Sequence, residues 1–143
     1  RQNLTVLPGT AGNEGVLRGA YVLHAPDGAP DVVLIGTGSE VAVCLDAALR
    51  LADEGVAARV VSFPSWELFA EQDVAYQAAV LPPAIKARVA VEAGITQGWH
   101  RWVGTEGAGL GIDHYGASAP ANTLFEEFGL TADRVVYFTI AIQ

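Results

Sequence analysis

The chain has 143 residues, 51% of them hydrophobic, and its 16 acidic and 8 basic residues give a net charge of -8. This length indicates one domain with a sizeable core, and the negative charge disfavours nucleic acid and anionic membranes as partners. No apolar run is long enough to span a membrane, so the hydrophobic residues are expected in a core and an interface. The single cysteine, Cys44, excludes an intrachain disulfide and is interpreted as a buried small hydrophobe.

Strands are predicted where short apolar runs are bounded by turn residues. Residues 1–18 are polar and rich in glycine, which predicts a loop leading into the domain. The predicted strands are 19–24, 32–35, 58–63 and 87–93, with a last strand or extended loop over 110–115. The first two strands are close in sequence and suggest an antiparallel hairpin, whereas 58–63 is expected to pair in parallel with 32–35.

Helices are predicted where apolar residues recur at three- and four-residue spacing. They cover 41–54, 65–69, 72–80, 94–103, 118–129 and a turn from Thr131 toward Val136, with expected N-caps at Ser39, Ser65, Ser118 and Thr131. Residues 137–143, YFTIAIQ, lack a helical charge pattern and form an atypical tail after an α/β domain over 19–136. The alternation predicts a three-layer α/β/α sandwich with about five mostly parallel strands, one of them antiparallel.

A glycine turn, Gly36-Thr37-Gly38-Ser39, joins the first buried strand to the first long helix. Backbone N–H groups at such a turn can hold an anion, and ligands in open α/β sheets lie at this edge. A dinucleotide fingerprint would need a third glycine at Val41 and an acidic residue near Ser62, and no P-loop lysine is present. We therefore favour glycines that make a tight turn.

Two further polar candidates lie at the ends of predicted strands. Glu92 ends the strand over 87–93 and could serve acid-base chemistry, but with no second carboxylate to pair with it we expect it to accept hydrogen bonds from loop amides. Asp113 and His114 lie in a glycine-rich loop, where functional groups are common, although a structural role is favoured for them as well.

The remaining histidines and tryptophans do not form a motif. His24 and His100 are distant from His114 in sequence and lack neighbouring metal ligands, so a metal site is not expected. The three tryptophans could stack on a ligand, but core or interface packing is their commoner use. They are Trp66, Trp99 and Trp102.

Eight stretches, in family order from Arg1 to about Val136, together resemble the C-terminal domain of transketolase. They are RQNL, GAYVL, DVVLIGTGSEV, ARVVSFPS, YQAAVLP, ARVAVEAG, GIDHYGASAP and LFEEFGLTADRVV. The resemblance implies a five-stranded mixed α/β fold with one antiparallel strand. It ends before residues 137–143, where the family continues with a charged amphipathic helix.

For the parent protein the resemblance implies a cytoplasmic homodimer of the pentose phosphate pathway. Its activity moves a two-carbon ketol unit from a ketose phosphate to an aldose phosphate with thiamine diphosphate and Mg²⁺ or Ca²⁺. The family's cofactor and metal motif is absent here and belongs to the two preceding domains, so the chain alone is expected to be inactive. The resemblance carries one site residue over: Arg1, as a contact for the phosphate of the sugar substrate.

Two alternatives stay open. The first is a self-standing module that binds a phosphorylated metabolite at Gly36 to Ser39. The second is the same domain in another thiamine enzyme. The chain begins with Arg1 and contains no methionine, which we interpret as processing or as a piece of a longer protein.

Overall fold

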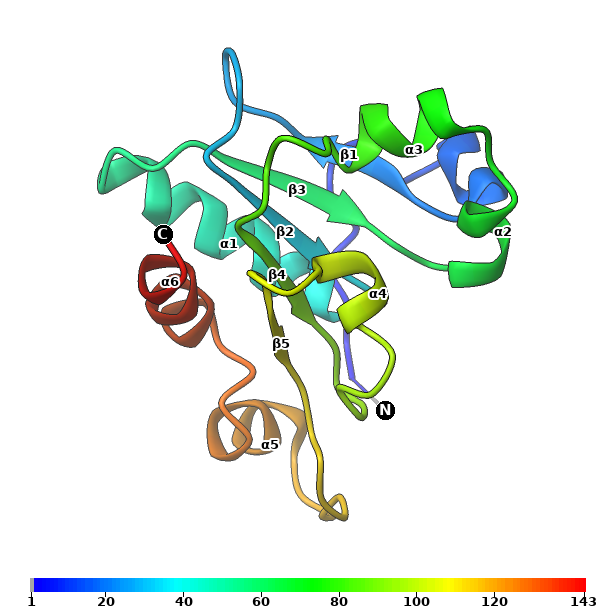
Figure 1. The fold of residues 1–143 in the computed structure, drawn as a ribbon. Helices are drawn as coiled ribbons and strands as arrows, with labels where there is room; N and C mark the ends of the chain where they lie inside the picture. The colour runs from blue at the N-terminus through cyan, green and yellow to red at the C-terminus, as the bar shows by residue number, and fades with distance from the viewer. Residues whose placement is uncertain (1) are drawn as a thin grey trace.

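Five strands form one mixed sheet in the computed structural model, which describes residues 2–143. The strands are β1 (Tyr21–His24), β2 (Val32–Gly36), β3 (Ala58–Ser62), β4 (Arg88–Val91) and β5 (Ala108–Leu110). Their order in the sheet is β1-β3-β2-β4-β5; β1 runs antiparallel to β3, and the other three pairs are parallel (Figure 1). This confirms the predicted mixed sheet with one antiparallel strand.

The predicted hairpin between the first two strands is wrong. β1 pairs with β3, Tyr21 opposite Ser62 and Val22 opposite Val61, and does not pair with β2. Both edges of β2 are already occupied by parallel neighbours, β3 on one side and β4 on the other. The free edge of β3 is therefore where the antiparallel strand can add its hydrogen bonds.

The unbroken apolar run of β2 is buried on both sides, as expected for a central parallel strand. Val32 and Leu34 join a cluster of aliphatic residues, and Val33 and Ile35 join a cluster on the opposite side that contains the large rings. We call these two sides of the sheet the aliphatic face and the aromatic face.

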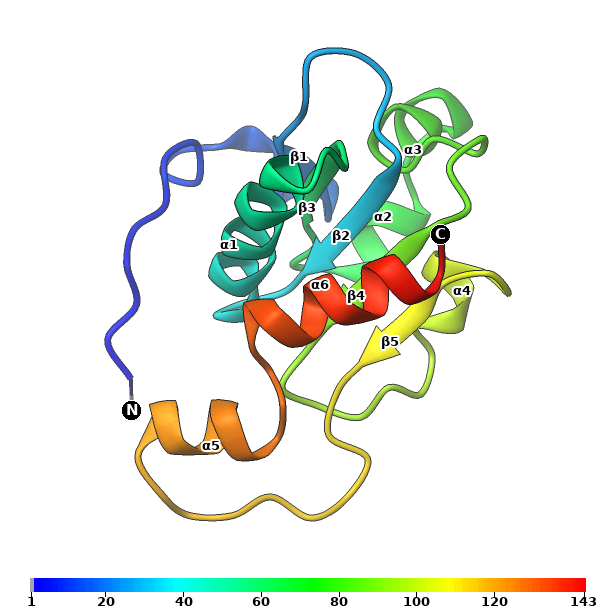
Figure 2. The ribbon, with the colours of Figure 1, turned by 90° about the vertical axis from the view of Figure 1, so that its left-hand side faces the viewer.

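Helices cover both faces and give the predicted three-layer sandwich (Figures 1 and 2). The aliphatic face carries α1 (Glu40–Asp53) and α6 (Ala132–Ala141), and the aromatic face carries α2 (Trp66–Ala70), α3 (Val74–Val80) and α4 (His100–Val103). Figure 2 shows α5 (Ala121–Glu127) apart from both layers, beside the edge where the parallel strands end. No helix among residues 2–143 is long and apolar enough to cross a membrane.

Several element boundaries differ from the sequence prediction. The N-terminal loop contains a short 3-10 helix, η1 (Glu14–Arg18), and α4 begins only at His100, because Gly98 has a φ of 97° that interrupts a right-handed helix. The fifth strand overlaps the predicted 110–115 only at Leu110, and residues 111–115 form a loop, the other structure that the sequence allowed. Ser65 and Thr131 cap α2 and α6 as predicted, but Pro120 occupies the N-cap of α5 where Ser118 was expected.

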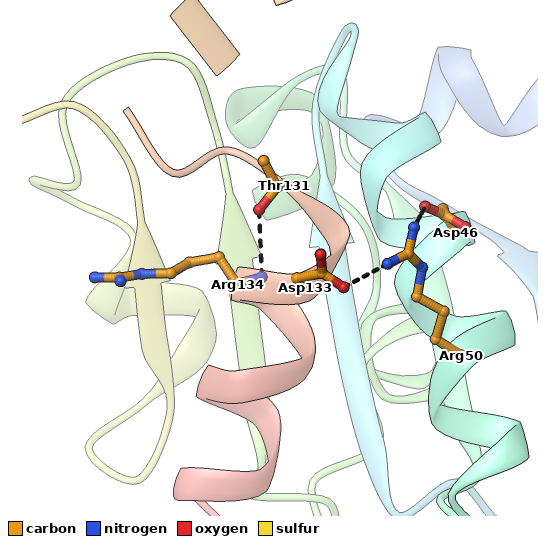
Figure 3. A network of polar contacts seen from close by, with 5 residues as sticks. All are labelled: Asp46, Arg50, Thr131, Asp133 and Arg134. Carbon is orange, nitrogen blue, oxygen red and sulfur yellow. Dashed lines mark hydrogen bonds and ion pairs between the residues drawn. The ribbon is translucent and has the colours of Figure 1, made fainter. Parts of the chain in front are cut away.

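Residues 137–141, which we expected in an atypical tail, belong to α6. α6 continues through Ala141 because Val135 and Thr139 are buried against the aliphatic face, and the Thr139 hydroxyl donates to the Val135 carbonyl at 2.8 Å. Asp133 also pairs with Arg50 of α1 (Figure 3). Tertiary packing thus stabilises a helix that its β-branched residues would not form alone.

Candidate functional site at the carboxyl edge of the sheet

The two glycines of the turn between β2 and α1 have structural reasons, close packing for Gly36 and a positive φ for Gly38. A Cβ on Gly36 would lie 2.8 Å from the Cα of Val41, and Gly38 has a φ of 57°. Ser39 stands at the N-cap position of α1, as predicted, but its hydroxyl accepts no hydrogen bond from the helix and instead donates to the carboxylate of Glu40. The glycines therefore let the strand and the helix pack closely.

Glu40 is a buried carboxylate, 4% exposed, at the N-terminus of α1. Its second oxygen accepts a hydrogen bond from the backbone N–H of Ala93 at 3.1 Å, which joins α1 to the end of β4. A carboxylate here already complements the helix dipole and would repel a bound phosphate. Sequence reasoning missed this residue, although an acidic residue following a predicted N-cap was the available signal.

Cys44 lies on α1, within the core of the aliphatic face. Burial raises the pKa of its thiol, and the negative charge of Glu40 raises it further. A protonated, inaccessible thiol is a poor nucleophile, so the interpretation of Cys44 as a buried small hydrophobe is confirmed.

Glu92 does not accept from loop amides as expected. Its carboxylate accepts a hydrogen bond from the indole Nε1–H of Trp99 at 2.6 Å. Trp99 is fully buried, so this bond satisfies an indole that would otherwise lack a partner. The carboxylate of Glu92 therefore has a structural partner from the aromatic face.

Asp113 joins two loops at the carboxyl edge. Its carboxylate accepts from both the backbone N–H and the hydroxyl of Thr96, at 2.7 Å each. These two bonds hold the pKa of Asp113 below its ordinary value, and the neighbouring His114 adds a smaller effect in the same direction. His114 itself contacts the carbonyl oxygen of Tyr115 through Nδ1 at 2.8 Å and packs edge-on against Phe128. Both residues thus have structural contacts.

The three histidines are not brought together. His24 ends β1, and His100 begins α4 on the aromatic face. Within residues 2–143, no group of three or more His, Cys, Asp or Glu side chains has the arrangement needed to hold a metal ion.

The tryptophans pack against one another and against phenylalanines in the aromatic face. Phe63 makes edge-to-face contacts with Phe69, Trp99 and Trp102 at ring-centroid distances of 4.9, 5.8 and 5.0 Å. Trp66 contacts Trp99 in the same way at 4.9 Å. Core packing, the favoured interpretation, therefore accounts for these rings.

A pocket of about 290 Å³ lies beside the glycine turn and is lined by Gly38 and Ser39. Residues 4–10 form one wall, and the start of α1 and the end of β3 form the other. Ser62, 9% exposed, lines this pocket, and its side chain makes no hydrogen bond to any of residues 2–143. Arg1, the site residue that the family resemblance carried over, lies outside the described residues. Its neighbour Gln2 lines a separate pocket beside α5.

The fold and the site together define an α/β domain whose loops gather at the carboxyl edge, with polar groups there engaged mainly in joining elements. Residues 19–131 match the family model described as the transketolase-like C-terminal domain. The chain belongs to this family.

Relatives and solved structures agree with this assignment. The chain is 51% identical over 138 residues to a chloroplastic transketolase of Craterostigma plantagineum, covering 95% of this chain and 26% of that protein. It is 51% identical over 140 residues to a Mycobacterium bovis transketolase, covering 94% and 20%. Transketolase from Leishmania mexicana superposes with a TM-score of 0.89 at 38% identity, covering 99% of this chain and 20% of that one.

A more distant solved structure is a split-gene transketolase described as an inactive β4 tetramer. It superposes with a TM-score of 0.66 at 25% identity, and the match covers 86% of this chain and 41% of that one. The chain thus spans about a fifth to a quarter of the length of the first relatives. Because several relatives are chloroplastic, the cytoplasmic location stays a prediction.

Proposed function

We propose that this chain works as the C-terminal domain of a longer transketolase, which transfers a two-carbon ketol unit from a ketose phosphate to an aldose phosphate. The observation that carries the proposal is the match of nearly the whole chain to one region of transketolases about four to five times its length. A structure from Pichia stipitis is described as a complex with sedoheptulose 7-phosphate, which supports sugar phosphates as the substrate class.

Thiamine diphosphate and a divalent cation supply the carbon-carbon chemistry of this class. The described residues do not suit that group: they contain no cluster of metal ligands, and a buried Glu40 carboxylate occupies the N-terminus of α1, where a diphosphate would otherwise be held. We therefore assign the cofactor to other domains of the same polypeptide and derive no chemical step through it here.

The proposed role of this chain is to hold the substrate phosphate and to present an interface. Arg1 would bind the phosphate through its planar fork of donors, which matches oxyanions well. Exposed apolar side chains near the carboxyl edge are the proposed contacts with the preceding domains of a homodimeric enzyme, and Tyr115, 99% exposed between β5 and α5, is the clearest of them.

Arg1→Ala in the complete polypeptide tests the phosphate role. Loss of one charge-assisted contact remote from the reacting carbon should raise KM for xylulose 5-phosphate by about ten- to a hundredfold, with kcat little changed. Xylulose without the phosphate is the matched substrate, and its KM should not change. Arg134→Ala, which removes an exposed arginine of α6, is the matched variant. Equal KM values for wild type and Arg1→Ala would reject the assignment.

An immunoblot of the source lysate tests the parent enzyme directly. A single band several times heavier than 14.9 kDa is expected, and that polypeptide should show ketol transfer. A band only at the size of this chain would instead favour a self-standing module.

The pocket beside the glycine turn supports that second candidate, because Ser62, which lines it, has a hydroxyl without a partner among residues 2–143. Titration of the chain with a sugar phosphate would distinguish the two: saturable binding that is lost in Ser62→Ala favours the module, and its absence favours the enzyme domain.

A further inference from the structure

A second pocket, on the aromatic face, gathers positive charge in a chain that is otherwise strongly acidic. Its volume is about 330 Å³, within the size range of small-molecule sites. Lys86, Arg88 and Arg101 line it, three of the eight basic residues of the chain, and within residues 2–143 no aspartate or glutamate does. Three cations without a facing carboxylate create a local positive potential that suits an anion.

Arg88 has a structural task in this pocket. Its guanidinium donates to the carbonyl oxygens of Ile85, Pro82 and Trp102 at 3.0, 2.9 and 2.8 Å. These bonds hold the segment between α3 and β4 against α4, so the pocket wall is built by the fold. Burial lowers the pKa of this guanidinium from its ordinary high value.

Lys86 and Arg101 are the cations with free donors. Both are exposed, and neither makes an ion pair or a side-chain hydrogen bond with any of residues 2–143. The Arg101 guanidinium lies 4.7 Å from the centre of the Trp102 ring, which holds the charge at the pocket wall. The two described ion pairs both involve Arg50, on the opposite face of the sheet.

The apolar part of the pocket supplies an independent observation. Phe69, Leu81 and Trp102 line it, all of them buried. The indole N–H of Trp102 is also buried and has no acceptor among residues 2–143. Because nearly all buried donors in native proteins have a partner, this unsatisfied N–H of a pocket-lining residue is an exception that the described residues do not explain.

We propose that this pocket binds a small organic phosphate or carboxylate, with its oxyanion between Lys86 and Arg101 and its apolar body against the Trp102 ring. The site is separate from the carboxyl edge and does not depend on the proposed function. Its occupant is a small molecule, because the pocket is concave and of metabolite size.

Phenyl phosphate is the probe for this site, since it joins an oxyanion to a flat apolar body. Calorimetric titration should use the complete polypeptide in an Arg1→Ala background, so that the proposed substrate phosphate contact does not contribute. We expect saturable binding in the millimolar range or tighter that weakens as salt is added. Benzyl alcohol, which lacks the charge, should not bind.

Substitutions at two exposed cations, together with one matched control, test where phenyl phosphate binds. Lys86→Gln and Arg101→Gln should each raise the Kd for phenyl phosphate by about tenfold, the size expected for the loss of one charge-assisted hydrogen bond. Arg134→Gln should leave it unchanged, although Arg134 is likewise an exposed arginine beside a ring, at 5.3 Å from the centre of Phe138. Thermal melts of the variants check that the fold is intact.

Several results would overturn the proposal. They are a titration that does not saturate, an affinity of Arg101→Gln equal to that of wild type, and a loss of affinity in Arg134→Gln as large as that in Arg101→Gln. Saturable binding of a poly-glutamate peptide without binding of phenyl phosphate would also overturn it and would assign the pocket to a protein partner. None of these measurements depends on the ketol-transfer activity of the enzyme.

Discussion

The two faces of the sheet are built in different ways. The aliphatic face is covered by two helices of 14 and 10 residues, whose buried side chains pack on alternate positions of the strands. The aromatic face is covered by helices of 5, 7 and 4 residues, too short to bury a continuous stripe. Large rings and arginine-to-carbonyl bonds take the place of helix length there, and the cationic pocket and the unpartnered Trp102 N–H lie on that side.

The largest expected effect is at the centre of the aromatic face. Phe63→Ala should lower the free energy of unfolding by about 3–5 kcal/mol, because it opens a cavity and removes three edge-to-face contacts. Urea denaturation measures the loss. Leu51→Ala in α1 is the control on the aliphatic face and should cost about 2–5 kcal/mol without ring contacts. A loss well below about 3 kcal/mol for Phe63→Ala would contradict the central role of this ring.

Arg88→Met tests the polar bonds that support the short helices. Several carbonyl oxygens would lose their donor, so the free energy of unfolding should fall by about 2–3 kcal/mol, even though the methionine keeps the apolar stem. Arg134→Met, a substitution at an exposed arginine of α6, is the matched control. If both variants unfold at the same urea concentration, the carbonyl bonds of Arg88 contribute nothing.

Asp113→Ala tests the two hydrogen bonds to Thr96 at the carboxyl edge of the sheet. The pKa of Asp113 is held below its ordinary value in the folded state, so its stabilising effect is present above about pH 4 and is lost as pH falls through the folded pKa. Thermal melts of wild type and variant should differ at neutral pH and converge on acidification. A difference that persists unchanged at low pH would show that the ionised carboxylate is not its source.

The smallest effect is expected on the aliphatic face, at the ion pairs of Figure 3. Arg50 pairs with Asp46 at 2.8 Å and with Asp133, but all three side chains are well exposed to solvent. Water and salt screen such pairs, so Arg50→Met should leave the urea midpoint almost unchanged. A loss comparable with that of Arg88→Met would mean that α6 depends on its charges and not on its packed face.

Many contacts of the candidate site join residues that are distant in sequence, so local sequence patterns could not predict them. The glycine turn and the edge position of Glu92 were predictable, because strand, turn and helix signals are local. The partner of Glu92 was not, since the Trp99 indole reaches it only after a loop of irregular backbone. The burial of Glu40 was equally hidden, because its acceptor role depends on Ala93, 53 residues away.

The sequence by itself determined the element types, the central buried strand, the mixed sheet and the family, because hydrophobic period, caps and family-like segments are carried by neighbouring residues. Only the tertiary structure decided the partner of β1, the helical state of residues 137–141 and the gathering of Lys86, Arg88 and Arg101 in one pocket. These features depend on which edges and faces remain free once the long-range packing is complete, and that competition is settled by the whole chain.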